Sequence, residues 1–258
     1  MFTGTPTSRR SFLYLTGSLA AGIALPVVAA GKNEGKEKES EVNPVEDLMR
    51  EHGVLRRVLL IYEEAINRIH ELKGVPSGVI ADSAGIIRRF VEDYHEKLEE
   101  DEIFPRFQKA GKFNDLVQVL LTQHQAGRRL TDTILKLSRP EEIKAPQETE
   151  ESSEAMKQIY QGTPLLNKKS QHTKHEPAPV MQEFILMYRP HAAWEDTVLF
   201  PAFRSIVSPR EFDELGEKFE DREKELFGKD GFEKMVESVG EIEKKLGIHE
   251  LSKFTPKI

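Results

Sequence analysis

A histidine that is followed four residues later by a glutamate, and shortly afterwards by a Phe-Pro-x-Phe block, occurs twice in this chain. The first copy is His95 and Glu99 with the block at 104–107, and the second is His191 and Glu195 with the block at 200–203. Residues four apart on a helix lie on one face, about one turn apart. Two such faces turned toward each other bring imidazoles and carboxylates together, which is the donor set of a dinuclear metal site between helices.

A single histidine precedes each of these pairs, and an arginine pair follows that histidine. His52 stands four residues before Arg56, and His124 stands four residues before Arg128. The chain therefore contains two copies of one helical hairpin, each with three residues that can bind a metal. Together they predict a pseudo-symmetric core of six ligands: His52, His95, Glu99, His124, His191 and Glu195.

Four segments of the chain have the apolar spacing of amphipathic helices. The stripes run over residues 48–69, 80–98, 116–137 and 180–198, and each has one of the four histidines in an apolar position. The histidines should therefore point into the core, where a buried imidazole needs a partner for its ring nitrogens. Four imidazoles at matched depth beside two carboxylates favour metal binding over a metal-free core.

The prolines near the metal-binding positions predict helix ends and one kink. Because proline disfavours helical geometry in the preceding residue, we expect Phe104-Pro105 and Phe200-Pro201 to end their helices, with the phenylalanines closing the bundle. Pro190 lies inside a helical pattern, directly before His191, and predicts a kink there.

This combination of motifs resembles the hemerythrin-like family, the HHE cation-binding domain, over residues 44–205. The resemblance is carried by the four histidines in order, the two H-x-x-x-E pairs and the Glu-Asp-x-Val-Leu-Phe-Pro run at 195–201. It implies an all-α, up-down-up-down four-helix bundle with a non-haem di-iron centre held by the same six residues. Two iron ions per chain are expected, although the donor set also suits manganese or zinc. The chain has no cysteine, which excludes thiolate zinc sites and iron–sulfur clusters.

The chain departs from oxygen-carrying hemerythrins near the expected centre. Those proteins have H-x-x-x-H on the third helix, where this chain has Arg128, which cannot bind a metal. They also have an aspartate five residues after the last histidine. Asp196 stands at that position, but the internal repeat favours Glu195, so Asp196 is the reserve ligand. Glu96 is either an additional oxygen ligand or a solvated surface acid, and the second reading is favoured.

The missing fifth imidazole leaves a coordination position for water, a carboxylate or a substrate. We therefore expect the centre to bind O₂, NO or a peroxide at an open iron position. The main hypothesis is a binding or sensing protein. The alternatives are a di-iron oxidoreductase of the peroxidase or NO-reducing type, and an iron storage or buffering protein, so the sequence leaves open whether the protein is an enzyme.

Residues 1–30 predict a signal peptide for export. The run Ser-Arg-Arg-Ser-Phe-Leu at 8–13 matches the twin-arginine signal, and small residues at 28–30 suit cleavage. The apolar run between them is broken and shorter than the roughly 20 residues of a membrane span, so no stable anchor is expected after cleavage. The twin-arginine export machinery carries folded proteins, which suits a periplasmic or extracytoplasmic protein whose metal is loaded before export.

The charge balance argues against nucleic acid as a partner. The chain has 37 basic and 44 acidic residues and a net charge of −7, whereas phosphate binding requires clustered cations. Arg56 and Arg128 are instead expected to pair with carboxylates, either as hydrogen-bond partners of the ligands or as salt bridges at the edge of the core.

The remaining segments surround the expected bundle. Residues 31–43 predict a disordered linker that ends in a helix cap at Asn43. A long polar insert at 138–179 contains His172 and His175, which are expected to be solvated. Residues 206–258 predict two additional helices, which either cap the bundle ends, the favoured role, or form a dimer face. His70 and His249 fit no metal-binding pattern and are expected at the surface.

Overall fold

The computed structural model describes residues 43–138 and 176–256, and all structural statements below concern these residues. The bundle begins with α1 (Pro44–His70). The cap predicted at its start is confirmed, because the Asn43 side chain accepts hydrogen bonds from the backbone N–H groups of Val45 and Glu46 at 3.2 and 3.1 Å. Pro44 occupies the first turn, where its missing N–H costs no helical hydrogen bond.

The second helix runs without a break from Val79 to Ala110, but its winding changes along the way. Its α-helical parts alternate with two π-helical parts: α2 (Val79–Ile86), η2 (Ile87–His95), α3 (Glu96–Leu98), η3 (Glu99–Ile103) and α4 (Phe104–Ala110). A π turn joins residues five apart and often marks a functional site. Here η2 ends at His95 and η3 begins at Glu99, so both predicted ligands lie where a π segment borders the short α3.

The aromatic-proline blocks do not end their helices, so that prediction is wrong. Phe104 and Phe200 both have right-handed helical backbone angles, with φ of −62° in each case. The helix continues through α4 after the first block and through α8 (Phe200–Phe203) after the second. Each block follows a π turn, so its proline falls in the first turn of a new α segment, where the absent N–H is tolerated.

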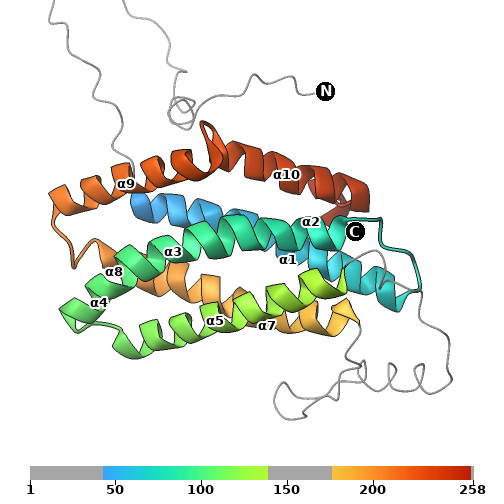
Figure 1. The fold of residues 1–258 in the computed structure, drawn as a ribbon, viewed down its shortest axis with the longest axis horizontal. Coiled ribbons are helices and arrows are strands. Elements are labelled where there is room, and N and C mark those ends of the chain that lie inside the picture. The colour runs from blue at the N-terminus through green and yellow to red at the C-terminus, as the bar shows by residue number, and fades with distance from the viewer. Residues whose placement is uncertain (1–42, 139–175, 257–258) are drawn as a thin grey trace, which may run out of the picture.

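The third and fourth helices complete an up-down-up-down four-helix bundle, which confirms the predicted all-α fold. They are α5 (Asn114–Leu137) and α7 (Pro177–Trp194), and α7 continues through the π-helical η4 (Glu195–Leu199) into α8. Consecutive helices run in opposite directions (Figure 1), and α7 packs against both α1 and α5. Pro190 lies inside α7, one residue before His191.

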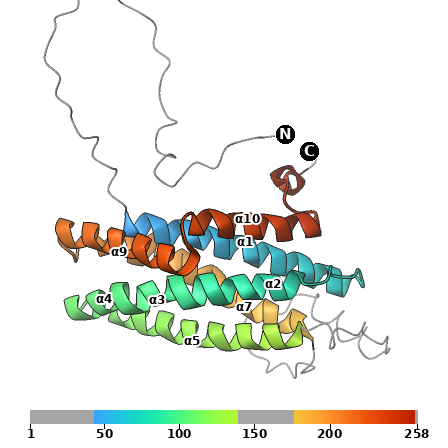
Figure 2. The same ribbon diagram turned by 45° about the horizontal axis from the view of Figure 1, so that its top comes forward.

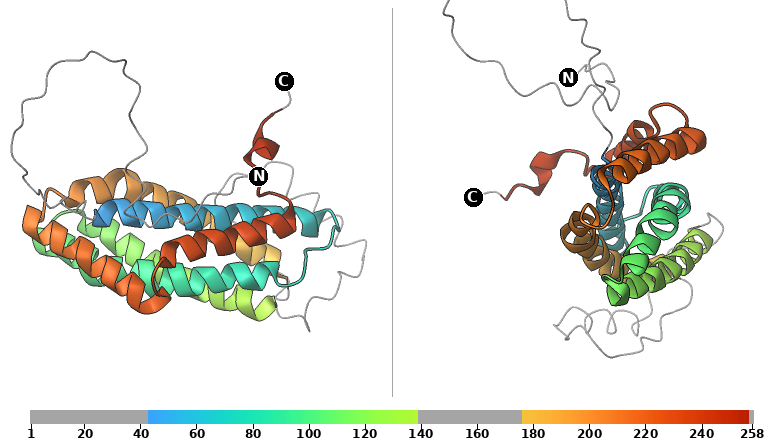
Figure 3. Two further views of the ribbon diagram at one scale, coloured as in Figure 1. Left: turned by 90° about the horizontal axis from the view of Figure 1, so that it is seen from above. Right: turned by 90° about the vertical axis from the view of Figure 1, so that its left-hand side faces the viewer.

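The C-terminal extension forms the two predicted helices, α9 (Pro209–Phe227) and α10 (Gly231–Leu246), followed by the short 3₁₀ turn η5 (Leu251–Phe254). They lie lengthwise over α1 and the second helix (Figures 2 and 3). Only the beginning of α9 reaches the aromatic end of the bundle, where the rings of Phe212 and Phe203 lie 6.4 Å apart. The extension therefore covers a side of the bundle more than an end.

A partly buried ion pair joins α10 to α1. The guanidinium of Arg57 donates two hydrogen bonds to the Glu243 carboxylate, at 2.8 and 2.6 Å. The same carboxylate lies 3.2 Å from Nδ1 of His249, whose side chain is about half exposed. His249 therefore stays near the surface but has a partner, and His70 is partly buried at the end of α1.

Several predictions fall on residues that the structure does not describe. These are the signal peptide at 1–30, nearly all of the linker that ends at residue 43, and most of the polar insert, with His172 and His175. Within the described ranges, no helix combines the length and the apolar character needed to cross a membrane.

Candidate metal centre

The six predicted ligands lie together in one buried cluster between the four helices of the bundle. The four histidines are at most 4% exposed, and both glutamates are 0% exposed. His95 is the last residue of η2, whereas Glu99 and Glu195 are the first residues of η3 and η4. Two overlapping sets lie close enough to share one ion each: His52, His95 and Glu99, and then Glu99, His124, His191 and Glu195.

Each glutamate reaches histidines of both hairpins. Oε1 of Glu99 lies 3.5 Å from Nε2 of His95, and its Oε2 lies 3.4 Å from Nε2 of His124. A single oxygen of Glu195 lies 3.4 Å from Nε2 of His52 and 3.1 Å from Nε2 of His191. Both carboxylates therefore lie between imidazoles of the two hairpins, and Glu99 belongs to both ligand sets.

The spacing of the inward-facing atoms fits metal coordination. The Nε2 atoms of His52 and His95 are 3.1 Å apart, and the four glutamate–histidine distances lie between 3.1 and 3.5 Å. Two ligands that each bind one ion at about 2.1 Å are about 3.0 Å apart at a right angle and about 3.4 Å apart at a tetrahedral angle. The residues therefore suit a metal ion without rearrangement of the helices.

Every histidine of the cluster turns its second ring nitrogen outward to an oxygen atom. A proton on that Nδ1 leaves the Nε2 lone pair for a metal, so the outer acceptor selects the tautomer that can act as a ligand. The four Nδ1–oxygen distances are 2.7 Å for His52 to Asp196, 2.8 Å for His95 to Glu51, 3.1 Å for His124 to Glu100 and 2.9 Å for His191 to Gln123.

The two glutamates at the centre have buried oxygens that no hydrogen bond from the described residues satisfies. Both carboxylate oxygens of Glu99 and of Glu195 are in this state, and so is Nε2 of His124. Burying a carboxylate without partners is costly, and native proteins rarely leave such groups unsatisfied. A cation between the imidazoles and carboxylates would satisfy all of these atoms at once.

The charges of the cluster also act on the histidine protons. Burial by itself lowers the pKa of His124, but the carboxylates of Glu96, Glu100 and Glu99 raise it to about 10. At His95, burial again lowers the pKa, but the carboxylates of Glu99 and Glu51 raise it. The pKa of His95 therefore lies well above its ordinary value, with Glu99 contributing most to the rise. Because a metal binds the deprotonated imidazole, metal binding at this site would release protons.

The preferred reading of Glu96 as a solvated surface acid is wrong. Its side chain is 1% exposed, accepts a hydrogen bond of 2.6 Å from the Tyr188 hydroxyl and pairs with Arg128 at 2.8 Å. Burial raises the pKa of Glu96, and His124, Tyr188 and Arg128 oppose that rise. Glu96 therefore supports the wall of the cluster on the side of α5 and α7.

Asp196, the reserve ligand, lies outside the ring of inward-facing atoms. Its carboxylate contacts Nδ1 of His52 and the guanidinium of Arg56. Arg128 has the matching position in the other hairpin, since it pairs at 2.8 Å with Glu100, the acceptor for His124. The arginines therefore pair with the acids that follow Glu195 and Glu99, and not with those two glutamates themselves.

The roles of the four outer acceptors were not predicted from the sequence, although the internal repeat contains a signal for them. Glu51 and Gln123 directly precede the single histidine of each hairpin. Glu100 and Asp196 directly follow the glutamate of each H-x-x-x-E pair. Equivalent positions in the two copies therefore perform equivalent contacts.

Aromatic rings cover the centre from the end of the bundle. Phe200 stacks on His52 with ring centroids 5.6 Å apart, and Phe104 stacks on His124 at 5.5 Å. The bundle interior also contains a further buried acid outside the six predicted ligands. The Glu92 carboxylate is fully buried, accepts a hydrogen bond of 2.5 Å from Thr131 and has a pKa that burial raises to about 7.

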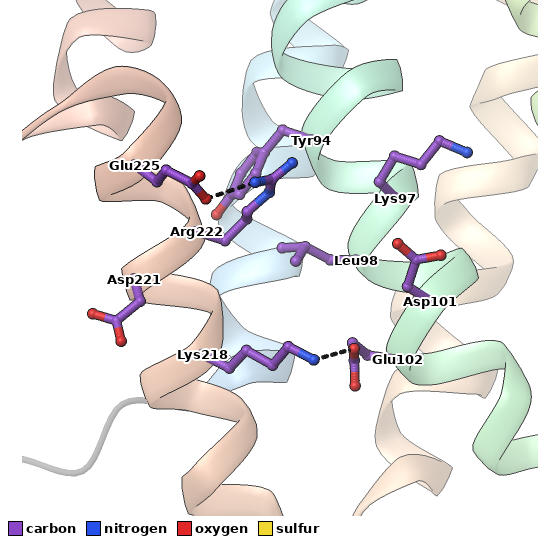
Figure 4. Close-up of a pocket in the computed structure, with 9 residues that line it drawn as sticks. All are labelled: Tyr94, Lys97, Leu98, Asp101, Glu102, Lys218, Asp221, Arg222 and Glu225. Atoms are coloured by element: carbon purple, nitrogen blue, oxygen red, sulfur yellow. Dashed lines mark hydrogen bonds and ion pairs between the residues drawn. The ribbon is translucent and has the colours of Figure 1, made fainter.

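A separate polar groove of about 470 Å³ lies between α9 and the second helix (Figure 4). Two ion pairs lie within it: Lys218 bonds Glu102 at 2.5 Å, and Arg222 bonds Glu225 at 2.6 Å. Tyr94 forms part of its wall and donates a hydrogen bond of 3.0 Å to Glu51, so the groove lies behind the outer acceptor of His95.

Comparison with known proteins identifies related sequences. The family model described as the hemerythrin HHE cation binding domain matches residues 43–163. The uncharacterized proteins Rv1995 of Mycobacterium tuberculosis and Mb2018 of Mycobacterium bovis are each 42% identical to this chain over 256 residues. Each alignment covers 96% of this chain and 91% of the relative. No solved structure matches the chain significantly.

Proposed function

Because this chain belongs to the hemerythrin HHE cation-binding family, we propose that its buried cluster holds two iron ions that bind O₂, NO or a peroxide. The observation that carries this proposal is the set of four buried glutamate oxygens at the centre of the imidazole cluster, which accept no hydrogen bond from the described residues. A pair of iron ions would supply a redox-active cation with an open position for such small ligands. Manganese and zinc suit the same donors.

The side chains around the cluster would prepare it for that role. The outer oxygens hold the four imidazoles with Nε2 inward, so little reorganisation accompanies metal binding. Phe104 and Phe200 stack on two of those imidazoles and exclude water from the end of the bundle. The result is a dry site whose charge depends on the bound ions.

A di-iron oxidoreductase of the peroxidase or NO-reducing type is the second candidate. Arg128, which stands where an oxygen carrier would have a fifth imidazole, pairs with Glu96 and Glu100 instead. With four imidazoles in the cluster, a coordination position is left for a substrate. A stable, reversible oxygen spectrum would favour a binding protein, whereas consumption of peroxide or NO would favour an enzyme. Rapid loss of iron to a weak chelator would favour storage.

Elemental analysis of the mature protein, purified without an affinity tag, tests the metal centre. We expect close to two irons per chain in the wild type and loss of both in His95→Ala/His191→Ala, because that variant removes one imidazole from each ligand set. The variant His70→Ala/His249→Ala, with two histidines outside the cluster, should retain full metal content. An absence of metal in the wild type, or one zinc that survives the first pair of substitutions, would refute the di-iron proposal.

We also propose that residues 1–30 direct export by the twin-arginine route. The support is the Ser-Arg-Arg-Ser-Phe-Leu motif before an interrupted apolar run. Arg9→Lys/Arg10→Lys should leave the full-length chain in the cytoplasm, whereas the wild type should be found outside it with a new N-terminus close to residue 30. An unprocessed wild-type chain that remains in the cytoplasm would contradict this proposal.

A further inference from the structure

The two hairpins differ in one contact that lies directly behind the metal cluster. In each hairpin, the residue before the single histidine contacts Nδ1 of the histidine in the H-x-x-x-E pair. Glu51 does this for His95 at 2.8 Å, and Gln123 does it for His191 at 2.9 Å. The geometry is nearly the same, but one acceptor is a carboxylate and the other is a neutral amide.

The surroundings of the two acceptors reinforce this difference. The Glu51 side chain is buried, with the residue 2% exposed, and its second oxygen accepts a hydrogen bond of 3.0 Å from Tyr94. The Gln123 contact is only partly buried. Electrostatic interactions are stronger away from water, so the negative charge of Glu51 acts on His95 with little screening.

A carboxylate that accepts the outer N–H of a ligand histidine makes that imidazole a more basic ligand. The metal position formed by His52 and His95 has carboxylates behind both imidazoles, Asp196 and Glu51. The position formed by His124 and His191 has one carboxylate and one amide behind its imidazoles, Glu100 and Gln123. The hydrogen-bond acceptors behind the two pairs of imidazoles therefore differ by one unit of charge.

We infer that Glu51 and Gln123 are positioning residues that make the two metal positions unequal. The position at His52 and His95 binds its ion first and more tightly, whereas the position at His124 and His191 is the weaker and more exchangeable one. This inference rests on the proposed dinuclear centre. It assigns the difference to two side chains that do not themselves touch the metal.

A stepwise titration of the metal-free full-length mature protein with Fe²⁺ under anaerobic conditions, in competition with a chelating dye, tests the inference. Substitution of a residue behind a metal ligand typically changes metal affinity by about 10- to 100-fold. We expect the two wild-type dissociation constants to differ by a factor in this range. Glu51→Gln should weaken the tighter step toward the weaker one, and Gln123→Glu should strengthen the weaker step toward the tighter one.

The exchange variant Glu51→Gln/Gln123→Glu keeps the net charge and nearly the same volume, so it separates electrostatics from packing. It should retain two unequal steps with their order reversed. Combination with His191→Ala, which damages the second position, reports on the first position alone: the remaining step should be tight with Glu51 and about 10- to 100-fold weaker with Gln at residue 51. Far-UV circular dichroism of each variant checks that the bundle is folded.

The possible results separate this inference from the proposed function. Two iron-binding steps with the same constants in the wild type, both single variants and the exchange variant would overturn the inference and leave the dinuclear centre intact. Failure of the folded wild type to bind iron would overturn the proposed function itself. A shift in melting temperature without any change in the binding constants would mean that Glu51 and Gln123 only stabilise the bundle.

Discussion

Iron binding is expected to raise the melting temperature of the mature protein by about 8–16 °C for each occupied position at a free metal concentration 1,000 times the dissociation constant. That concentration adds about 4.1 kcal/mol of stability per site, and each kcal/mol shifts a domain of this size by about 2–4 °C. The physical cause is the pair of 0% exposed carboxylates, Glu99 and Glu195, whose oxygens face imidazoles without hydrogen bonds from the described residues.

Glu99→Gln/Glu195→Gln removes both central carboxylates while it keeps the shape of the core. We expect its melting temperature to respond to iron by less than about 2 °C, because the site then has only neutral donors. Asp93→Asn is the matched control, since Asp93 is an exposed acid on the same helix as Glu99. Thermal scans with and without metal provide the measurement. An equal iron response in the double variant would show that iron binds elsewhere.

The positions of the six candidate ligands could be predicted because two independent patterns agree on them. Helical periodicity places each histidine on the buried face of its helix, and the internal repeat shows which faces belong together. Asn43 and Ser208 caps were also predictable, because a side-chain acceptor at that position has a purely local effect.

The winding of the ligand helices could not be predicted from the sequence. A change from four-residue to five-residue hydrogen bonding at Glu99 and Glu195 depends on the packing of the whole bundle, and residue propensities do not report it. The proline rule failed at Phe104 and Phe200 for this reason. It assumes an ordinary α-helix before the proline, whereas each block follows a π turn.

The burial of Glu96 was missed because its partners are distant in the sequence. Tyr188 and Arg128 come from two other helices, and together they satisfy a carboxylate that looks exposed in its own charged segment. The same reason applies to the C-terminal helices, whose apolar stripes were evident but whose place along α1 depends on pairs such as Arg57 and Glu243.

Gly127→Ala is expected to destabilise the protein by about 2–5 kcal/mol, although alanine is normally the better helix residue. A Cβ at Gly127 would stand 1.9 Å from the Tyr188 hydroxyl oxygen and 2.7 Å from the ring carbon that bears it. Tyr188 is almost completely buried, so its ring must shift and lose its hydrogen bond to Glu96. Denaturant unfolding of the metal-free protein measures this loss directly.

Gly53→Ala is the matched control, because a Cβ at Gly53, in the middle of α1, would meet nothing within 4 Å. There the gain in helix propensity stands alone, and we expect stabilisation by about 0.5–1 kcal/mol. The opposite signs of the two glycine substitutions separate a close packing contact from a general preference for alanine in helices. A Gly127→Ala variant as stable as the wild type would show that Tyr188 does not fill the space beside Gly127.

Tyr188→Phe in the Gly127→Ala background tests the cause of the effect. The phenylalanine lacks the oxygen that a Cβ would approach most closely, but it also leaves the buried Glu96 without that hydrogen bond. We therefore expect the double variant to be destabilised by less than the sum of the single variants, with a coupling energy of about 1 kcal/mol or more. Strict additivity would mean that the two residues act independently, and it would assign the cost of Gly127→Ala to another neighbour. Coupling would show that Gly127 on α5 makes room for Tyr188 on α7, whose hydroxyl donates a hydrogen bond to the Glu96 carboxylate beside the histidine–glutamate cluster.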